Sequence, residues 1–107
     1  MNQHREQYRI LIERTGRLHW NGKVTNCHVW DLTEFGFQVQ TDLDLSAGEL
    51  VRLDCVLDLD SHIECAVLIT YVRRPIAGGP IVDISPEHQK RLTHFIEQML
   101  SMTLGGM

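Results

Sequence analysis

Two arginines stand four positions apart near the start of the chain, in the stretch HREQYRI that runs from His4 to Ile10. A guanidinium group donates paired hydrogen bonds from a rigid fork, which suits the oxygens of a phosphate and the O6/N7 edge of guanine. The residues around them show neither a helical nor a strand pattern. Arg5 and Arg9 therefore indicate either a solvated leader or an arm that closes over a small anionic ligand.

A second stretch whose residue types could bind a ligand is DLTEFG, which begins at Asp31 and ends at Gly36. Asp and Thr side chains bond nearby amides in turns, and a glycine permits the close approach of another backbone, so the stretch is typical of an acidic turn between strands. Alternatively, the Asp31 carboxylate is a double acceptor that matches the N1 and N2 donors of guanine. The residues alone leave both interpretations open.

These two stretches must be positioned by a small β domain. An extended segment at residues 10–20 precedes Asn21-Gly22, a dipeptide that favours a tight hairpin turn, and a returning strand follows at residues 23–30. Residues 35–40 then alternate apolar and polar side chains, with Gln38 and Gln40 on the polar side. This alternation indicates a further strand with one buried face.

Two longer alternating runs follow, separated by a turn at Asp60-Ser61. Their apolar members are predicted to share a buried face, namely Val51, Leu53, Cys55, Leu57, Leu59, Ile63, Cys65, Val67, Ile69 and Tyr71. A loop rich in glycine and proline is predicted at residues 74–80, and a short strand at residues 81–84.

A helix is predicted over residues 86–102, because Ser85 can cap it, Pro86 suits its first position and Glu87 its first turn. Short antiparallel strands must bury one face and protect their edges, so we expect a mainly β fold. The predicted fold is a small six- or seven-stranded antiparallel barrel with a C-terminal helix. We expect a single domain over residues 1–107, with an arm at 1–9, the barrel at 10–85 and a tail at 103–107.

Composition argues against several classes of protein. The chain has 107 residues, of which 43% are hydrophobic and 22% charged, as in an ordinary globular domain. A formal charge of -4 does not fit a general binder of nucleic acid, so we expect neither DNA nor RNA as a partner. No apolar run could span a bilayer, and the three cysteines lie in core-like contexts without a CxxC pair. We therefore expect a cytoplasmic protein with reduced thiols and no membrane association.

Motifs for catalysis and metal binding are missing from the sequence. It contains no GxSxG, no phosphate-binding glycine loop and no general-base pair, so we do not expect an enzyme. The six histidines and three cysteines show no paired ligand spacing beyond the adjacent Cys27 and His28. Neither a metal site nor a cofactor is predicted.

Taken together, REQYR and DLTEFG resemble the motifs of the PilZ domain, a bacterial receptor family for the second messenger cyclic di-GMP. That family carries RxxxR on an arm before the first strand and [D/N]xSxxG after the second strand of a small β-barrel. Arg5 and Arg9 match the first motif, and Asp31, Thr33 and Gly36 match the second. The resemblance extends to the run of strands, to GGPIVDIS and to the final helix.

The resemblance implies a receptor or adaptor in which the arm closes over cyclic di-GMP and thereby changes a surface for a protein partner. Thr33 replaces the usual serine, and Glu34 and Phe35 stand where the family often has smaller residues. Three further residues could contact the ligand, namely His4, Trp30 and Arg74, although Trp30 could equally be a core or rim aromatic and Arg74 a charged strand end. The alternative for the whole chain is a PilZ-like protein-interaction module that does not bind the nucleotide.

Overall fold

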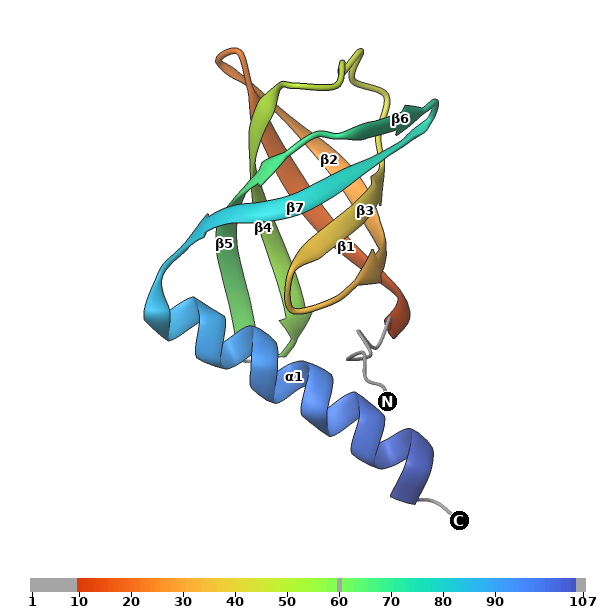
Figure 1. Cartoon of the computed structure of the whole chain (residues 1–107), viewed down its shortest axis with the longest axis vertical. Coiled ribbons are helices and arrows are strands. Elements are labelled where there is room, and N and C mark those ends of the chain that lie inside the picture. Colours follow the sequence, from red (N-terminus) through yellow and green to blue (C-terminus); the bar gives the residue numbers. More distant parts are fainter. Residues whose placement is uncertain (1–9, 60, 106–107) are drawn as a thin grey trace, which may run out of the picture.

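The computed structural model describes residues 10–59 and 61–105. Within these ranges the order of elements is β1 (Ile10–Trp20), β2 (Lys23–Leu32), β3 (Gly36–Gln40), β4 (Leu50–Asp58), β5 (Ser61–Leu68), β6 (Tyr71–Arg73), β7 (Ile76–Ile84) and α1 (Pro86–Gly105). The strands form one antiparallel sheet in the order β3-β2-β1-β4-β5-β7-β6, and β3 also pairs with β7. This pairing closes a six-stranded barrel with β6 as an added strand, and α1 lies across one end (Figure 1). The predicted mainly β barrel with a C-terminal helix is confirmed.

The first hairpin follows from its turn residues. Asn21 and Gly22 join β1 to β2 with φ angles of 50° and 77°, and Trp20 pairs with Lys23 across the turn. Two successive residues with positive φ give a turn whose twist matches that of the flanking strands. Asn and Gly are the residues that tolerate this backbone best, so the predicted turn is confirmed.

The barrel is filled by the alternating apolar residues of its strands. The inward-facing members of β4 and β5 are almost fully buried, namely Val51, Leu53, Cys55, Leu57, Ile63, Cys65 and Val67. The prediction was wrong for Leu59 and Tyr71, which are 100% and 44% exposed. Leu59 lies beyond the end of β4 at Asp58, and Tyr71 belongs to the short added strand β6 (Tyr71–Arg73) rather than to β5.

The loop predicted at residues 74–80 is confined to a turn at residues 74–75, and residues 76–80 are instead the first half of β7, so the prediction was wrong for those five residues. β7 pairs with β3, β5 and β6, and its Gly78 and Gly79 pass very close to neighbouring backbone. A Cβ atom on Gly78 would lie 2.6 Å from the carbonyl oxygen of Phe37, and one on Gly79 would collide with that of Leu68. The glycines therefore permit tight strand packing rather than a flexible connection.

The helix α1 begins as its sequence predicts, because the Ser85 hydroxyl accepts a hydrogen bond from the His88 amide at 3.1 Å. Its buried residues are Leu92, Phe95 and Ile96, and the Arg14 guanidinium lies 5.6 Å from the centre of the Phe95 ring. The helix continues to Gly105 rather than ending at residue 102, since no glycine or proline interrupts it earlier. In the part of the chain that the structure describes, no helix has the length and apolarity needed to cross a membrane.

The three cysteines are buried in the barrel as free thiols. Burial raises the pKa of Cys27 to about 11 and the pKa values of Cys55 and Cys65 to about 12. A thiol with such a pKa is protonated at neutral pH and therefore a poor nucleophile. The interpretation of these residues as core thiols is consistent with their position.

Candidate functional site

The turn between β2 and β3 is organised by the side chain of Thr33. Its hydroxyl oxygen accepts hydrogen bonds from the amides of Phe35 and Gly36, at 3.0 and 3.1 Å. The Thr33 amide donates to the carbonyl oxygen of Gly36 at 3.0 Å. Three hydrogen bonds thus hold the DLTEFG stretch in one shape, and the hydroxyl of Thr33 has a structural role within it.

Gly36 stands where the barrel closes. It is the first residue of β3 and pairs with Pro80 of β7. A Cβ atom at this position would lie 2.6 Å from the carbonyl oxygen of Gly79, closer than real Cβ atoms come to a backbone oxygen. The glycine of the DxTxxG pattern is therefore needed for the close approach of β3 and β7, whatever else the motif does.

Asp31 is positioned by a β-bulge in β2. Val29 pairs with Val39 and Asp31 pairs with Gln38, so Trp30 is the extra residue between two ladder positions. A bulge changes the direction in which the following side chains point. Here it interrupts the alternation of buried and exposed residues along β2, so that Asp31 and Leu32 are both buried. Asp31 is only 9% exposed and remains at the border of the surface depressions described next.

A groove of about 590 Å³ lies beside the turn, between β3 and the β6–β7 hairpin. Its lining comprises Asp31, Leu32, Thr33, Phe35, Gly36, Phe37, Gln38, Thr70, Tyr71, Gly78, Gly79 and Pro80. This volume is within the range of small-molecule sites, and the groove contains all three described residues of the predicted motif. Phe35 and Tyr71 are 51% and 44% exposed, so the groove offers aromatic rings to a ligand.

A second groove of about 590 Å³ is lined by Ile12, Glu13, Trp30, Asp31 and Gln38. The two grooves share Asp31 and Gln38, so a ligand on either side of this pair would meet the same carboxylate and amide. Trp30 lines the second groove, and its indole N–H donates to the Gln40 side chain at 2.8 Å. Sequence reasoning missed Gln38 and Tyr71 as site residues. Alternation placed Gln38 on an outward face without indicating a groove, and it placed Tyr71 on the buried face.

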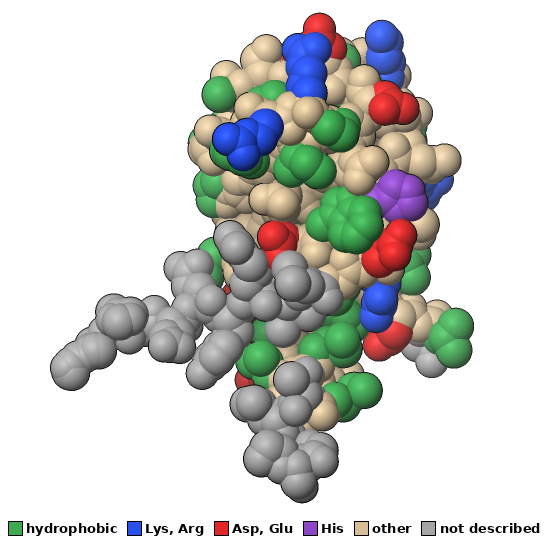
Figure 2. Space-filling model, turned by 90° about the vertical axis from the view of Figure 1, so that its right-hand side faces the viewer, with side chains coloured by type: hydrophobic (Ala, Val, Ile, Leu, Met, Phe, Trp, Pro, Cys, Tyr) green, Lys and Arg blue, Asp and Glu red, His purple; other side chains and the backbone are tan. Residues whose placement is uncertain are grey.

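The remaining predicted site residues are Arg74, His4, Arg5 and Arg9. Arg74 forms an ion pair with Asp44 and belongs to neither groove lining. His4, Arg5 and Arg9 lie outside the described residues. Figure 2 shows one face of the molecule, on which acidic and basic side chains are interspersed among apolar and neutral ones.

Substituting Thr33 tests its role in the turn. Thr33→Val keeps the shape of the side chain but removes the acceptor of two amide hydrogen bonds, so we expect a loss of about 1 kcal/mol in the free energy of unfolding. Thr33→Ser keeps the hydroxyl and should cost less. Urea unfolding of the two variants measures the difference, and equal stabilities would show that the hydroxyl does not hold the turn.

Solved structures share this architecture. MotI/DgrA of Bacillus subtilis, named as an inhibitor of motility, superposes on 94% of this chain with a TM-score of 0.76 and 16% identity. The PilZ domain of CeSA, from a cellulose-synthesising bacterium, superposes on 86% of this chain with a TM-score of 0.69 and 14% identity, and 97% of that domain is covered. PlzA of Borreliella burgdorferi, solved in complex with cyclic di-GMP, superposes on 86% with a TM-score of 0.62 and 16% identity.

At these identities the likeness establishes the fold, and the chain has a PilZ-like β-barrel with a C-terminal helix. The chain spans 53% of the length of MotI/DgrA and 40% of PlzA. Its sequence matches no family model and no curated protein.

Proposed function

Because the barrel has a PilZ-like fold, we propose that this protein binds cyclic di-GMP and acts as a receptor or adaptor for it. The observation that carries the proposal is the register of β1 and β2, which pairs Ile10 with Leu32 and Leu11 with Asp31. Strand β1 therefore begins beside the acidic turn, and in the sequence Arg9 of the RxxxR motif directly precedes Ile10. Arg5 is five residues before Ile10, within about 18 Å along an extended chain.

The chemistry of the ligand matches this arrangement. Cyclic di-GMP offers two phosphates and two guanines. Arginine forks suit the phosphate oxygens and the O6/N7 edges, and a carboxylate suits the Watson–Crick donors of guanine. In the proposed complex Arg5 and Arg9 contact phosphates and guanine edges, and Asp31 accepts from one base. The exposed rings of Phe35 and Tyr71 supply faces on which a base can stack.

Ligand binding would be coupled to a change of surface. Ordering a segment costs about 1 to 2 kcal/mol per residue, so an arm that orders upon binding closes only when its charged contacts offset that entropy. Closure would then place the arm over the grooves and alter what the barrel presents to a protein partner.

A second candidate function is a PilZ-like interaction module that does not bind the nucleotide. It is favoured by the structural roles of Thr33 and Gly36, which hold the turn and the β3–β7 contact. A chain that had lost the ligand would still need both residues in order to fold. Calorimetric titration of the wild-type chain with cyclic di-GMP separates the candidates, because the interaction module would release no binding heat.

Substituting Asp31 tests the proposed recognition of a guanine base by its carboxylate. Asp31→Asn keeps the size of the side chain but replaces an acceptor oxygen with an amide, so contacts to the guanine N1 and N2 donors weaken. A lost charge-assisted hydrogen bond costs about 1.5 to 3 kcal/mol, so the preference for cyclic di-GMP over cyclic di-AMP should fall by about one to two decades. Calorimetry with both dinucleotides measures this ratio.

The matched control is Asp42→Asn, which removes the same charge from an exposed carboxylate that belongs to neither groove lining. This control should retain the wild-type ratio of affinities. An unchanged ratio in Asp31→Asn would contradict base recognition by Asp31.

A further inference from the structure

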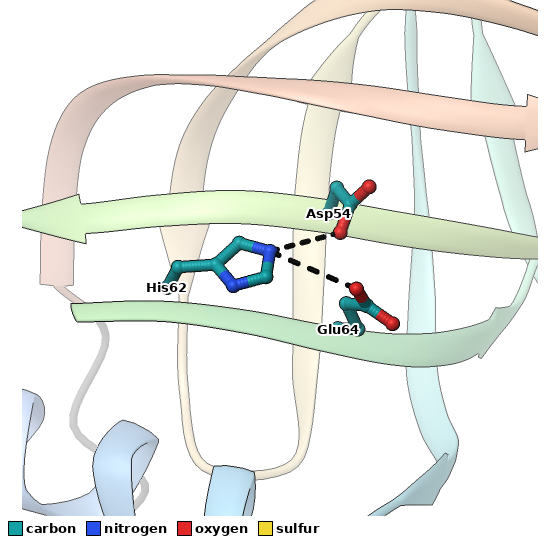
Figure 3. A group of neighbouring side chains, drawn as sticks. All are labelled: Asp54, His62 and Glu64. Atoms are coloured by element: carbon teal, nitrogen blue, oxygen red, sulfur yellow. Dashed lines mark hydrogen bonds and ion pairs between the residues drawn. The ribbon is translucent and has the colours of Figure 1, made fainter.

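Three side chains converge on the outer wall of the barrel, on the strands β4 and β5 (Figure 3). The Nε2 atom of His62 lies 3.1 Å from Oδ1 of Asp54 and 3.9 Å from Oε2 of Glu64. One ligand atom from each of the three residues lies within 4.8 Å of the other two. None of these residues lines the two grooves beside the DLTEFG turn.

The register of the hairpin creates this cluster. Asp54 pairs directly with Glu64, and Val56 pairs with His62, so the imidazole lies diagonally beside two facing carboxylates. Like charges directly opposite each other on a sheet are destabilising unless positive charge lies near them. The arrangement therefore favours a cation between the two carboxylates.

Two arginines contact these carboxylates, but only at long ion-pair distances. Arg17 lies 3.7 Å from Asp54 and Arg52 lies 3.9 Å from Glu64, both at the outer limit of an ion pair and on exposed side chains. His19 contacts the second oxygen of Asp54, with Nε2 at 3.2 Å from Oδ2.

We propose that Asp54, His62 and Glu64 form a binding site for a divalent first-row transition metal ion, for which Zn²⁺ is the best match. Tetrahedral zinc with bonds of about 2.0 to 2.2 Å separates its donor atoms by about 3.4 Å. The distances of 3.1 and 3.9 Å from the imidazole nitrogen bracket this value. One imidazole and two carboxylates form a mixed N/O set, which suits zinc better than the all-oxygen sets of Ca²⁺ and Mg²⁺.

Further contacts hold the proposed ligands in position. His19 contacts the other carboxylate oxygen of Asp54, Oδ2, in the manner of the outer partners that orient a metal-bound carboxylate. The His88 ring accepts a hydrogen bond from the Glu64 amide at 2.9 Å, and Arg91 donates to the carbonyl oxygen of His62 at 2.7 Å. The first turns of α1 thus anchor the backbone of two ligands. The side chains of His62 and Glu64 are about half exposed, which leaves the site open to an ion and to a water as fourth ligand.

Titration of the full chain with zinc chloride at pH 7.5, in a buffer that does not chelate metals, tests the site. Calorimetry should show saturable binding of one Zn²⁺ per chain. His62→Gln and Glu64→Gln should each lower the affinity at least about tenfold, since even outer-shell substitutions reduce metal affinity about 10- to 100-fold. Both side chains are exposed enough for the variants to fold, which circular dichroism would check.

The matched control is His28→Gln, which removes an exposed histidine from β2, outside the cluster. It should bind Zn²⁺ as the wild-type chain does, and Zn²⁺ should raise the melting temperature of this control but not that of His62→Gln. The proposal is overturned if the wild-type chain shows no saturable binding, or if His62→Gln and His28→Gln bind Zn²⁺ equally. Binding of cyclic di-GMP is tested by a separate titration with the dinucleotide, so neither proposal depends on the other.

Discussion

Replacing both arginines of the N-terminal motif, Arg5→Ala together with Arg9→Ala, should lower the affinity for cyclic di-GMP by at least about a hundredfold. Each arginine makes charge-assisted hydrogen bonds in the proposed complex, and each such loss costs about 1.5 to 3 kcal/mol, or about one to two decades in affinity. The single variants should each lose about one to two decades. Isothermal titration calorimetry on the wild-type chain and the three variants measures these losses.

Arg17→Ala provides the charge-matched control. Arg17 is an exposed arginine of β1 whose side chain lies near Asp54, away from both grooves. Its removal changes the net charge as each single variant does, but it should leave the affinity for the dinucleotide nearly unchanged. Wild-type affinity in the double variant would refute the assignment of the RxxxR motif to ligand binding.

Gly79→Ala should lower the free energy of unfolding by about 3 kcal/mol or more, because over-packing of a closely fitted interior costs about 1 to 3 kcal/mol, and a collision with backbone atoms lies at the upper end of this range. The added methyl group would collide with the carbonyl oxygen of Leu68 and lie 3.0 Å from the amide nitrogen of Thr70. Both contacts are to backbone, so no side-chain rotation relieves them. β7 would have to move away from residues 68–70, and the Thr70 amide would lose its hydrogen bond to Gly78, now 2.9 Å long.

Urea unfolding of Gly79→Ala measures this loss, with Gly48→Ala as its control. Gly48 has a φ of 98°, and among the described residues beyond its two chain neighbours no atom lies within 4 Å of an added Cβ, so its substitution introduces backbone strain without a collision. Left-handed backbone strain costs about 1 to 2 kcal/mol, so Gly48→Ala should be the more stable of the two variants. The opposite order would show that β7 adjusts to a side chain at position 79.

Several features of the protein were determined by residues close together in the sequence. Asn21-Gly22 predicted the first hairpin, because few other residues accept two positive φ angles in succession. Ser85 and Pro86 predicted the start of α1, and period-two alternation predicted which face of β4 and β5 is buried. The DLTEFG stretch was also recognisable as a turn, since the bonds of Thr33 span only three residues.

Contacts between segments that are far apart in the sequence determined the features that the sequence alone did not predict. Gly78 and Gly79 looked like loop residues, since the sequence cannot tell a glycine that bends the chain from one that admits a neighbouring strand. The grooves depend on β3 meeting β7, which brings Tyr71 within reach of the acidic turn. The Asp54, His62 and Glu64 cluster depends on the β4–β5 register. Alternation states which side chains share a face of one strand, but only strand pairing determines which residues of the next strand stand opposite them.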